Sequence, residues 1–287
     1  MFYNLRKSIV PKLSERKKTR MLFSMFYKIY YTFFGPLHLL PDFYILGGQK
    51  CGTTSMFVYL SKHPGILSPS SKDIRFFDKY FSKGVNWYKI NFPLKLTKFF
   101  TRKKHSKILT GEGTERYLDH PFAPQRIKEI TPDAKFIILL RNPISRSFSQ
   151  YSRVKGNNRE NLSFKEAFLN ESKRTKDDFK KIYENPLYYA DSYFTYSYFE
   201  RGLYVDKIKR WMEVFPKEQF LIIQSEEFFK NPSKTYNDVL EFLGLKLFSL
   251  KKFEIKGKVN KNRTIDDDFR NELVDYFKPH NQKLYDF

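Results

Sequence analysis

The stretch that decides the fold is Phe43-Tyr44-Ile45-Leu46-Gly47-Gly48-Gln49-Lys50-Cys51-Gly52-Thr53-Thr54. Its first four residues form an apolar run that is typical of a buried strand, and two glycines end the run. After Thr53, apolar residues follow at Met56, Phe57 and Leu60, which is a helical spacing. Glycines let backbone N–H groups turn toward one anion, and a helix N-terminus adds its dipole. The stretch therefore predicts a strand, a phosphate-binding turn and a helix.

The rest of the chain alternates between the same two patterns. Strands are predicted at residues 107–109, 135–140 and 220–223, and helices at 204–215, 236–243 and 269–277. Strands that alternate with helices predict a parallel sheet covered on both faces, which is an α/β, P-loop-like fold of three layers. The polar, Tyr-rich residues 170–200 are interpreted as an insertion or lid. With no long linker, we expect one domain over residues 41–287 after an N-terminal extension, residues 1–40.

Composition narrows the class of protein. The 287 residues include 53 Lys and Arg against 31 Asp and Glu, a formal net charge of +22, and 18% are aromatic. So many aromatics exclude disorder for most of the chain, and one cysteine excludes an intrachain disulfide. A mean hydropathy of −0.58 excludes a polytopic membrane protein. The charge predicts an anionic partner, which composition alone does not identify.

The N-terminal extension has its own composition. Residues 6–20 carry seven basic residues and one acid, and residues 21–40 are apolar and aromatic. A membrane span needs roughly 20 apolar residues, and Lys28, Gly35 and Pro36 interrupt this segment. Two interpretations remain: a helix packed on the domain, which we favour, or a basic, aromatic segment on an anionic membrane surface.

The turn differs from that of nucleotide-hydrolysing P-loops. In those proteins a Lys follows the second glycine, whereas here Lys50 precedes Gly52 by two residues and Thr53 occupies the usual Lys position. The next long strand ends in Arg141 instead of an Asp that could hold magnesium. Asn142-Pro143 then predicts a helix start, and Ser149 lies two turns into that helix. An Arg and a hydroxyl at one sheet edge suit a terminal phosphate, and we expect no metal.

The turn, together with residues 55–64, resembles the phosphosulfate-binding loop of sulfotransferases that use 3′-phosphoadenosine 5′-phosphosulfate (PAPS). The resemblance is greatest to the heparan sulfate N- and 3-O-sulfotransferase branch and its bacterial relatives, and it runs from about Pro41 to the C-terminus. It implies that Arg141 and Ser149 bind the 3′-phosphate. Residues 261–264 resemble a Lys-Gly-Arg-Thr loop that closes over the nucleotide, although a solvated basic loop explains them equally well. The cofactor-binding residues that we infer are Gly48, Gln49, Lys50, Cys51, Gly52, Thr53, Thr54, Arg141, Ser149, Lys261 and Arg263.

The same resemblance implies the catalytic residues. Lys50 matches the lysine at the bridging oxygen and the 5′-phosphate. Residues 71–78 resemble a Lys-Glu-x-x-Phe-Phe-Asp segment whose Glu is the proposed base, and Asp73 stands in that position. Residues 111–118 resemble a second segment, in which Glu112 matches the acid and is a second candidate base. The lysine that follows this acid in the family is Gly113 here, so we infer that Arg75 or Arg116 supplies the charge.

These observations predict an enzyme that moves a sulfuryl group from PAPS to a hydroxyl, in preference to an amine, of a glycan or glycolipid by in-line displacement, releasing adenosine 3′,5′-bisphosphate. Two alternatives stay open: a nucleotide kinase or NTPase that uses the same turn, and a basic nucleic-acid-binding protein. We expect no nucleic-acid partner. A single cysteine favours a reducing compartment, so we expect a cytoplasmic location, with peripheral membrane contact through residues 1–40 as the open alternative.

Overall fold

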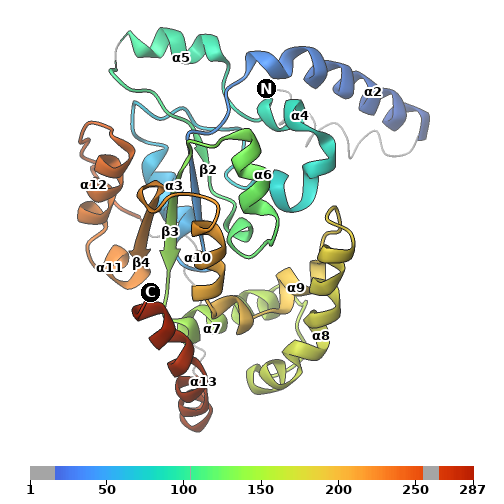
Figure 1. Ribbon diagram of the computed structural model, residues 1–287, viewed down its shortest axis with the longest axis vertical. Coiled ribbons are helices and arrows are strands. Elements are labelled where there is room, and N and C mark those ends of the chain that lie inside the picture. The colour runs from blue at the N-terminus through green and yellow to red at the C-terminus, as the bar shows by residue number, and fades with distance from the viewer. Residues whose placement is uncertain (1–16, 104, 255–264) are drawn as a thin grey trace.

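The computed structural model describes residues 17–103, 105–254 and 265–287, with side chains from residue 24 onward. A four-stranded parallel sheet stands at the centre, and helices cover both of its faces (Figure 1). The strands are β1 (Phe43–Gly47), β2 (Gly111–Glu112), β3 (Lys135–Leu140) and β4 (Phe220–Gln224). The α-helices are α2 (Lys17–Phe34), α3 (Thr53–Leu60), α4 (Val85–Lys89), α5 (Lys95–Arg102), α6 (Ala123–Ile130), α7 (Pro143–Gly156), α8 (Phe164–Glu184), α9 (Asp191–Tyr196), α10 (Val205–Met212), α11 (Ser225–Lys230), α12 (Pro232–Leu243) and α13 (Asp267–Tyr285). Short helical turns are η1 (Gly35–Leu37), η2 (Phe76–Tyr80), η3 (Phe81–Lys83), η4 (Glu115–Leu118), η5 (Glu200–Gly202) and η6 (Lys217–Gln219).

The strand order is β2-β1-β3-β4, and every neighbouring pair is parallel. This confirms the predicted α/β fold with its central parallel sheet. The strands predicted near residues 43, 135 and 220 are present, but the one predicted at residues 107–109 is displaced. There, only Leu109 pairs, in an isolated bridge with Ile66. The reason is Asp42, whose backbone N–H donates to the Thr110 carbonyl and whose carboxylate accepts from the Thr110 N–H, so pairing with β1 starts at Gly111.

The two faces of the sheet build two hydrophobic cores. Because side chains alternate along a strand, Tyr44, Leu46 and Phe136 point to one face while Phe43, Ile45 and Ile137 point to the other. The first core also includes residues of α4, α6 and α10, and the second includes residues of α3 and α12. Apolar runs in β1 and β3 are therefore buried on both sides, as expected of central parallel strands.

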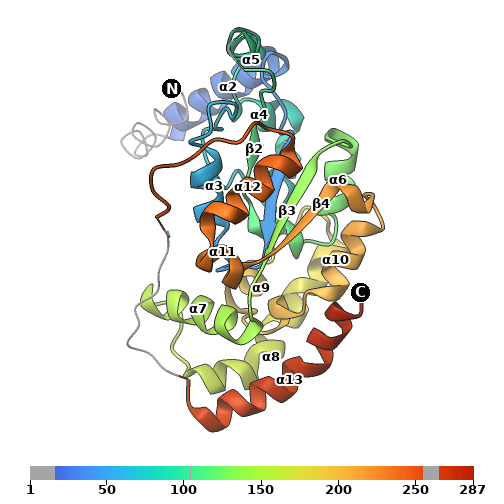
Figure 2. The ribbon, with the colours of Figure 1, turned by 90° about the vertical axis from the view of Figure 1, so that its left-hand side faces the viewer.

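Beyond the carboxyl ends of the strands lies a further layer. Helices α7, α8 and α13 meet there in a third apolar cluster around Tyr151, Phe164 and Phe277 (Figure 2). The Tyr-rich insertion forms α8, α9 and the loop between them, and Phe179 and Tyr193 pack together with their rings 4.3 Å apart. This layer faces the phosphate-binding turn across the sheet edge.

The N-terminal extension contains the expected helix. In α2, Tyr27 and Tyr31 pack against the first core, while Phe26 and Phe33 are exposed. Across residues 17–103, 105–254 and 265–287, no helix is both long enough and apolar enough to cross a membrane.

Candidate active site

The phosphate-binding turn connects β1 to α3 through backbone conformations that few residues adopt. Gly47 and Gly52 have φ values of 130° and 94°, and Lys50, which is not a glycine, has φ of 75°. A Cβ at Gly47 would lie 2.3 Å from the Leu139 carbonyl oxygen, so only glycine fits beside β3. At Lys50 the left-handed conformation costs of order 1–3 kcal/mol, which is typical of residues held for function. The sequence therefore predicts where the turn lies. The structure adds that Lys50 itself has the left-handed backbone conformation that forms the turn.

Surrounding elements hold the turn in place. The Gly48 N–H donates to the Leu139 carbonyl at 3.1 Å, and the Ser225 hydroxyl donates to the Cys51 carbonyl at 2.7 Å. The Cys51 thiol is fully buried, and burial raises its pKa to about 11. Its N–H donates to Gly48 within the turn. Cys51 thus fills the turn from the inside as a neutral thiol, which fits a small packing residue better than a direct ligand.

At the end of β3, Arg141 lies beside the turn. Its guanidinium donates to the Lys50 carbonyl at 3.3 Å, and its own carbonyl accepts from the Tyr204 hydroxyl at 2.8 Å. Asn142 caps α7 by accepting from two backbone N–H groups, as the Asn-Pro pair predicted. Ser149 follows on α7 and is buried. The pairing of β3 with β1 therefore brings Arg141 close to Lys50.

The charges around Lys50 indicate an anion site. Burial lowers the pKa of Lys50, and the positive charges of Arg153 and Arg141 lower it further, while Glu115 raises it. An anion that binds among these cations reduces the repulsion between them. Arg153 was not among the residues predicted from sequence, although its position four residues after Ser149 places it on the same side of α7. A search of that helix face for a second cation would have found it.

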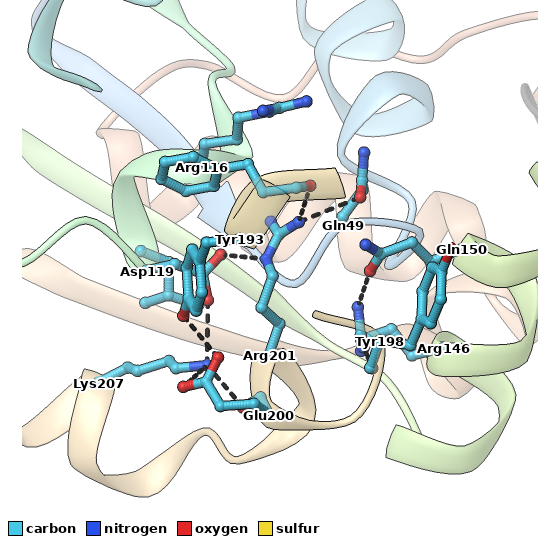
Figure 3. A network of polar contacts seen from close by, with 12 residues as sticks. Gln49, Arg116, Asp119, Arg146, Gln150, Tyr193, Tyr198, Glu200, Arg201 and Lys207 are labelled. Atoms are coloured by element: carbon cyan, nitrogen blue, oxygen red, sulfur yellow. Dashed lines mark hydrogen bonds and ion pairs between the residues drawn. The ribbon is translucent and has the colours of Figure 1, made fainter. Parts of the chain in front are cut away.

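Below the turn lies a buried polar network, shown in Figure 3. Arg201, fully buried, donates to the Gln49 side chain at 3.1 Å and to Asp119 at 2.8 Å. Lys207 pairs with the same Asp119 at 3.1 Å. Lys207 also pairs with Glu200 at 3.4 Å, so the two cations are matched by two carboxylates, as buried charges require. The hydrogen bond from Arg201 thus orients the Gln49 side chain.

The predicted base lies in a small cluster of ionisable groups. Asp73 accepts from Lys72 at 2.8 Å, and Lys72 also reaches Glu115 at 3.3 Å. Partial burial and the nearby Glu115 raise the pKa of Asp73, and Lys72 opposes this. Burial alone would raise the pKa of Glu115, but Lys72 and neighbouring arginines outweigh it and lower that pKa to about 2. Asp73 is 47% exposed, so an acceptor can reach it. Glu115 was not predicted, because its approach to Lys72 depends on tertiary packing.

Glu112, the second candidate base, lies elsewhere. It pairs in register with Tyr44 and is fully buried. Burial raises its pKa to about 8, although the nearby hydroxyls of Tyr117 and Tyr88 lower it. A base must touch the proton that it removes. In this conformation Glu112 is a neutral group inside the first core, and the structure gives Asp73 the more accessible position.

A group of cations lies beside Asp73. The Arg75 guanidinium is 4.7 Å from the ring centre of Tyr189, as is the Lys79 ammonium, and Arg116 donates to the Tyr189 hydroxyl. Tyr189 comes from the loop between α8 and α9, so the insertion covers these cations with an aromatic ring. A Cβ at Gly113 would lie 3.1 Å from the aliphatic stem of Lys72. Lys72 therefore occupies the space beside Gly113 that a larger side chain would fill.

Of the predicted cofactor-binding residues, Lys261 and Arg263 lie outside the described part of the chain.

The sheet is parallel, and its carboxyl edge carries a glycine-rich turn, a lysine and an arginine. These features define an α/β protein that binds a phosphorylated ligand. Comparison then gives the family: the sulfotransferase domain family matches residues 40–271, and the chain belongs to this family of transferase enzymes. The crystal structure of a sulfotransferase from Alicyclobacillus acidocaldarius is 31% identical, with a TM-score of 0.62, over 86% of this chain and 94% of that one.

Several curated proteins are similar in sequence to most of this chain. The membrane-associated sulfotransferase kil1 of Dictyostelium discoideum is 25% identical over 88% of this chain. A mouse heparan sulfate glucosamine 3-O-sulfotransferase, 3B1, is 27% identical over 86%, and the human bifunctional heparan sulfate N-deacetylase/N-sulfotransferase 3 is 28% identical over 85%. The aligned regions span 66%, 63% and 29% of the lengths of these relatives.

Proposed function

We propose that this protein transfers the sulfuryl group of PAPS to a hydroxyl group of a glycan. Family membership supports sulfuryl transfer, and the Lys50 turn with Arg141 supports a nucleotide that carries several phosphate charges. Relatives named for heparan sulfate support a glycan acceptor, and those named 3-O-sulfotransferases support a hydroxyl as the acceptor group. The Lys50–Arg141 contact is the observation that carries the proposal.

In this mechanism the acceptor oxygen attacks sulfur as the bond from sulfur to the bridging phosphate oxygen breaks. Negative charge grows on the leaving 5′-phosphate, and Lys50 neutralises it together with the N–H groups at the start of α3. Arg141, Ser149 and Arg153 hold the 3′-phosphate, which fixes the nucleotide for in-line attack. The products are the sulfate ester and adenosine 3′,5′-bisphosphate.

The acceptor proton goes to a carboxylate in the Lys72 cluster. Asp73 is the base that we assign, since it is the more exposed of the two carboxylates and its pKa is raised, which strengthens it as a proton acceptor. Glu115, whose pKa is about 2, stays ionised and keeps Lys72 charged. Lys79 and Arg116 lie beside this cluster and suit an acceptor that is itself acidic, whereas Arg75 is already paired with the buried Asp78 at 2.6 Å.

Calorimetry with adenosine 3′,5′-bisphosphate in the absence of magnesium tests the proposal. The parent protein is expected to bind it, and Arg141→Ala is expected to weaken binding by about one to two orders of magnitude, since a charge-assisted hydrogen bond contributes roughly 1.5–3 kcal/mol. Arg102→Ala, on α5 at the other end of the sheet, is the matched control and should bind like the parent. Transfer of labelled sulfate from PAPS to an unsulfated heparan backbone then tests turnover.

The two alternative functions predict different results. A kinase or NTPase would prefer ATP with magnesium, and a nucleic-acid-binding protein would bind oligonucleotides in a steeply salt-dependent manner without a discrete nucleotide site. Either result, together with no binding of the bisphosphate, would overturn the proposal.

A further inference from the structure

Helix α2 exposes apolar side chains on the side that faces away from the core. Tyr27 and Tyr31 pack inward, whereas Phe26, Ile29 and Phe33 point outward, and Phe33 is 72% exposed. The spacing of three and four residues puts the exposed group on one helix face. Nothing in the described part of the chain covers this face.

Helix α5 exposes a second apolar group. Leu96, Phe99 and Phe100 are each more than half exposed, and Phe99 is 61% exposed. The Lys103 ammonium lies within 6 Å of both phenylalanine rings, so a cation accompanies the aromatics. A helix of eight residues that buries no side chain gains little from folding in water alone.

The two helices belong to one end of the molecule. His38, which follows α2 and η1, forms an antiparallel bridge with Leu94, which precedes α5. The Leu39 N–H donates to the Pro93 carbonyl at 2.9 Å, and Lys98 of α5 pairs with Asp42 at the start of β1. Both figures show α2 and α5 at the amino ends of the strands, away from α7 and α13 (Figure 1, Figure 2). We call the exposed residues of this end the apolar end surface: Met25, Phe26, Ile29, Phe33, Phe34, Leu37, Leu94, Leu96, Phe99 and Phe100.

The charge around this surface is mostly positive, and Asp42, which pairs with Lys98, is an acid beside it. Residues 17–40 and 92–107 contain ten basic residues and no acidic one. Aromatic and aliphatic side chains that enter the acyl boundary, flanked by lysines that contact phosphates, are the pattern of a helix bound in a membrane interface. We propose that the apolar end surface docks on an anionic phospholipid bilayer, with α2 and α5 lying in its interface.

Two other occupants explain the surface less well. A second copy in a symmetric dimer would place this basic surface against an identical basic surface, which is electrostatically unfavourable. A protein partner requires a complementary shape and a fixed set of contacts. A lipid surface requires neither a matching shape nor a fixed register. It also fits residues 6–16, which precede α2 in the sequence and carry four basic residues and one acid.

Vesicle sedimentation of the full chain tests the proposal. The probes are vesicles of phosphatidylcholine and of an equimolar mixture of phosphatidylcholine and phosphatidylglycerol. We expect binding to the mixed vesicles, weakened by added salt, and little binding to phosphatidylcholine alone. Phe99→Ser with Phe100→Ser, and separately Phe26→Ser with Phe33→Ser, should each reduce binding by about tenfold or more, because each pair removes two aromatic anchors.

Leu169→Ser with Tyr285→Ser is the matched control, since both side chains are exposed on α8 and α13 at the opposite end. All these positions are solvent-exposed, so melting temperatures should stay close to that of the parent. The proposal is overturned if the parent does not bind mixed vesicles, or if the phenylalanine variants bind as tightly as the control. It is also overturned if the phenylalanine variants instead abolish a dimer in sedimentation velocity, because the occupant would then be a second copy.

Discussion

Three carboxyl groups near the site show how the surroundings of a residue set its chemistry. Asp73 is half exposed beside Lys72, Glu115 shares that lysine and is held ionised, and Glu112 is sealed among tyrosines and holds its proton. The sequence identified Asp73 and Glu112 by their motifs but did not separate them, because burial depends on the register of β2 against β1. It did not identify Glu115, whose approach to Lys72 depends on tertiary packing, whereas Arg153 could have been found on the face of α7 that carries Ser149. The positions of Lys50 and Arg141 in the fold were predictable, because the turn that contains Lys50 follows β1 and Arg141 follows β3.

Glu112→Gln separates these roles. Burial raises the folded-state pKa of Glu112 from about 4.5 to about 8, so between these values the folded protein keeps a proton that the unfolded chain has lost. The stability of the parent therefore falls as the pH rises from about 4.5 through about 8. The neutral Gln should remove this fall and make the variant more stable than the parent at pH 8, as melting temperatures across the pH range would show.

Turnover measurements on two variants distinguish Asp73 from Glu112 as the base. Glu112→Gln should transfer sulfate at nearly the parent rate, whereas Asp73→Asn should lose about two orders of magnitude or more in turnover while it keeps its affinity for adenosine 3′,5′-bisphosphate. If Glu112→Gln is inactive and Asp73→Asn remains active, the base is Glu112 instead.

At the scale of elements, apolar runs predicted three of the four strands, because buried parallel strands are nearly all apolar. β2 was misplaced because two residues of pairing leave no periodic signal, and hydrogen bonds with Asp42 set its start. The insertion was recognised by composition only. Its helices α8 and α9, and the placement of Tyr189 over Arg75 and Arg116, depend on contacts between residues more than seventy positions apart.

The α8–α9 loop is expected to act on the acceptor and not on the nucleotide. Tyr189→Ala removes the ring from beside Arg75, Lys79 and Arg116, and should raise the KM for the glycan several-fold without changing bisphosphate affinity, since a cation–π contact contributes roughly 0.5–2 kcal/mol. Tyr189→Phe keeps the ring and loses only the hydroxyl that accepts from Arg116, so it should lie between the parent and Tyr189→Ala. Equal loss of nucleotide binding and acceptor binding would show that the loop supports the whole site.

At the scale of the molecule, the surplus of positive charge has several locations. Lys50, Arg141 and Arg153 surround the proposed nucleotide site, Arg75 and Arg116 lie on the acceptor side, and further basic residues surround the apolar end surface. The phosphate-binding turn lies at the carboxyl ends of the strands and the apolar end surface at their amino ends (Figure 1). A protein docked through that surface therefore carries its nucleotide site on the side away from the bilayer.

This orientation makes a prediction about the acceptor. A long glycan can reach a site that faces away from the membrane, whereas a short lipid-linked sugar in the same bilayer cannot. The protein bound to vesicles of phosphatidylcholine and phosphatidylglycerol should thus sulfate a soluble glycan at a rate close to that of the free protein. A glycolipid with a short head group in those vesicles should be a poor acceptor, and the Phe99→Ser, Phe100→Ser variant should lose vesicle binding but keep its rate on the soluble glycan. If vesicle binding instead blocks soluble glycan or speeds transfer to the short glycolipid, the site faces the bilayer and the orientation is wrong.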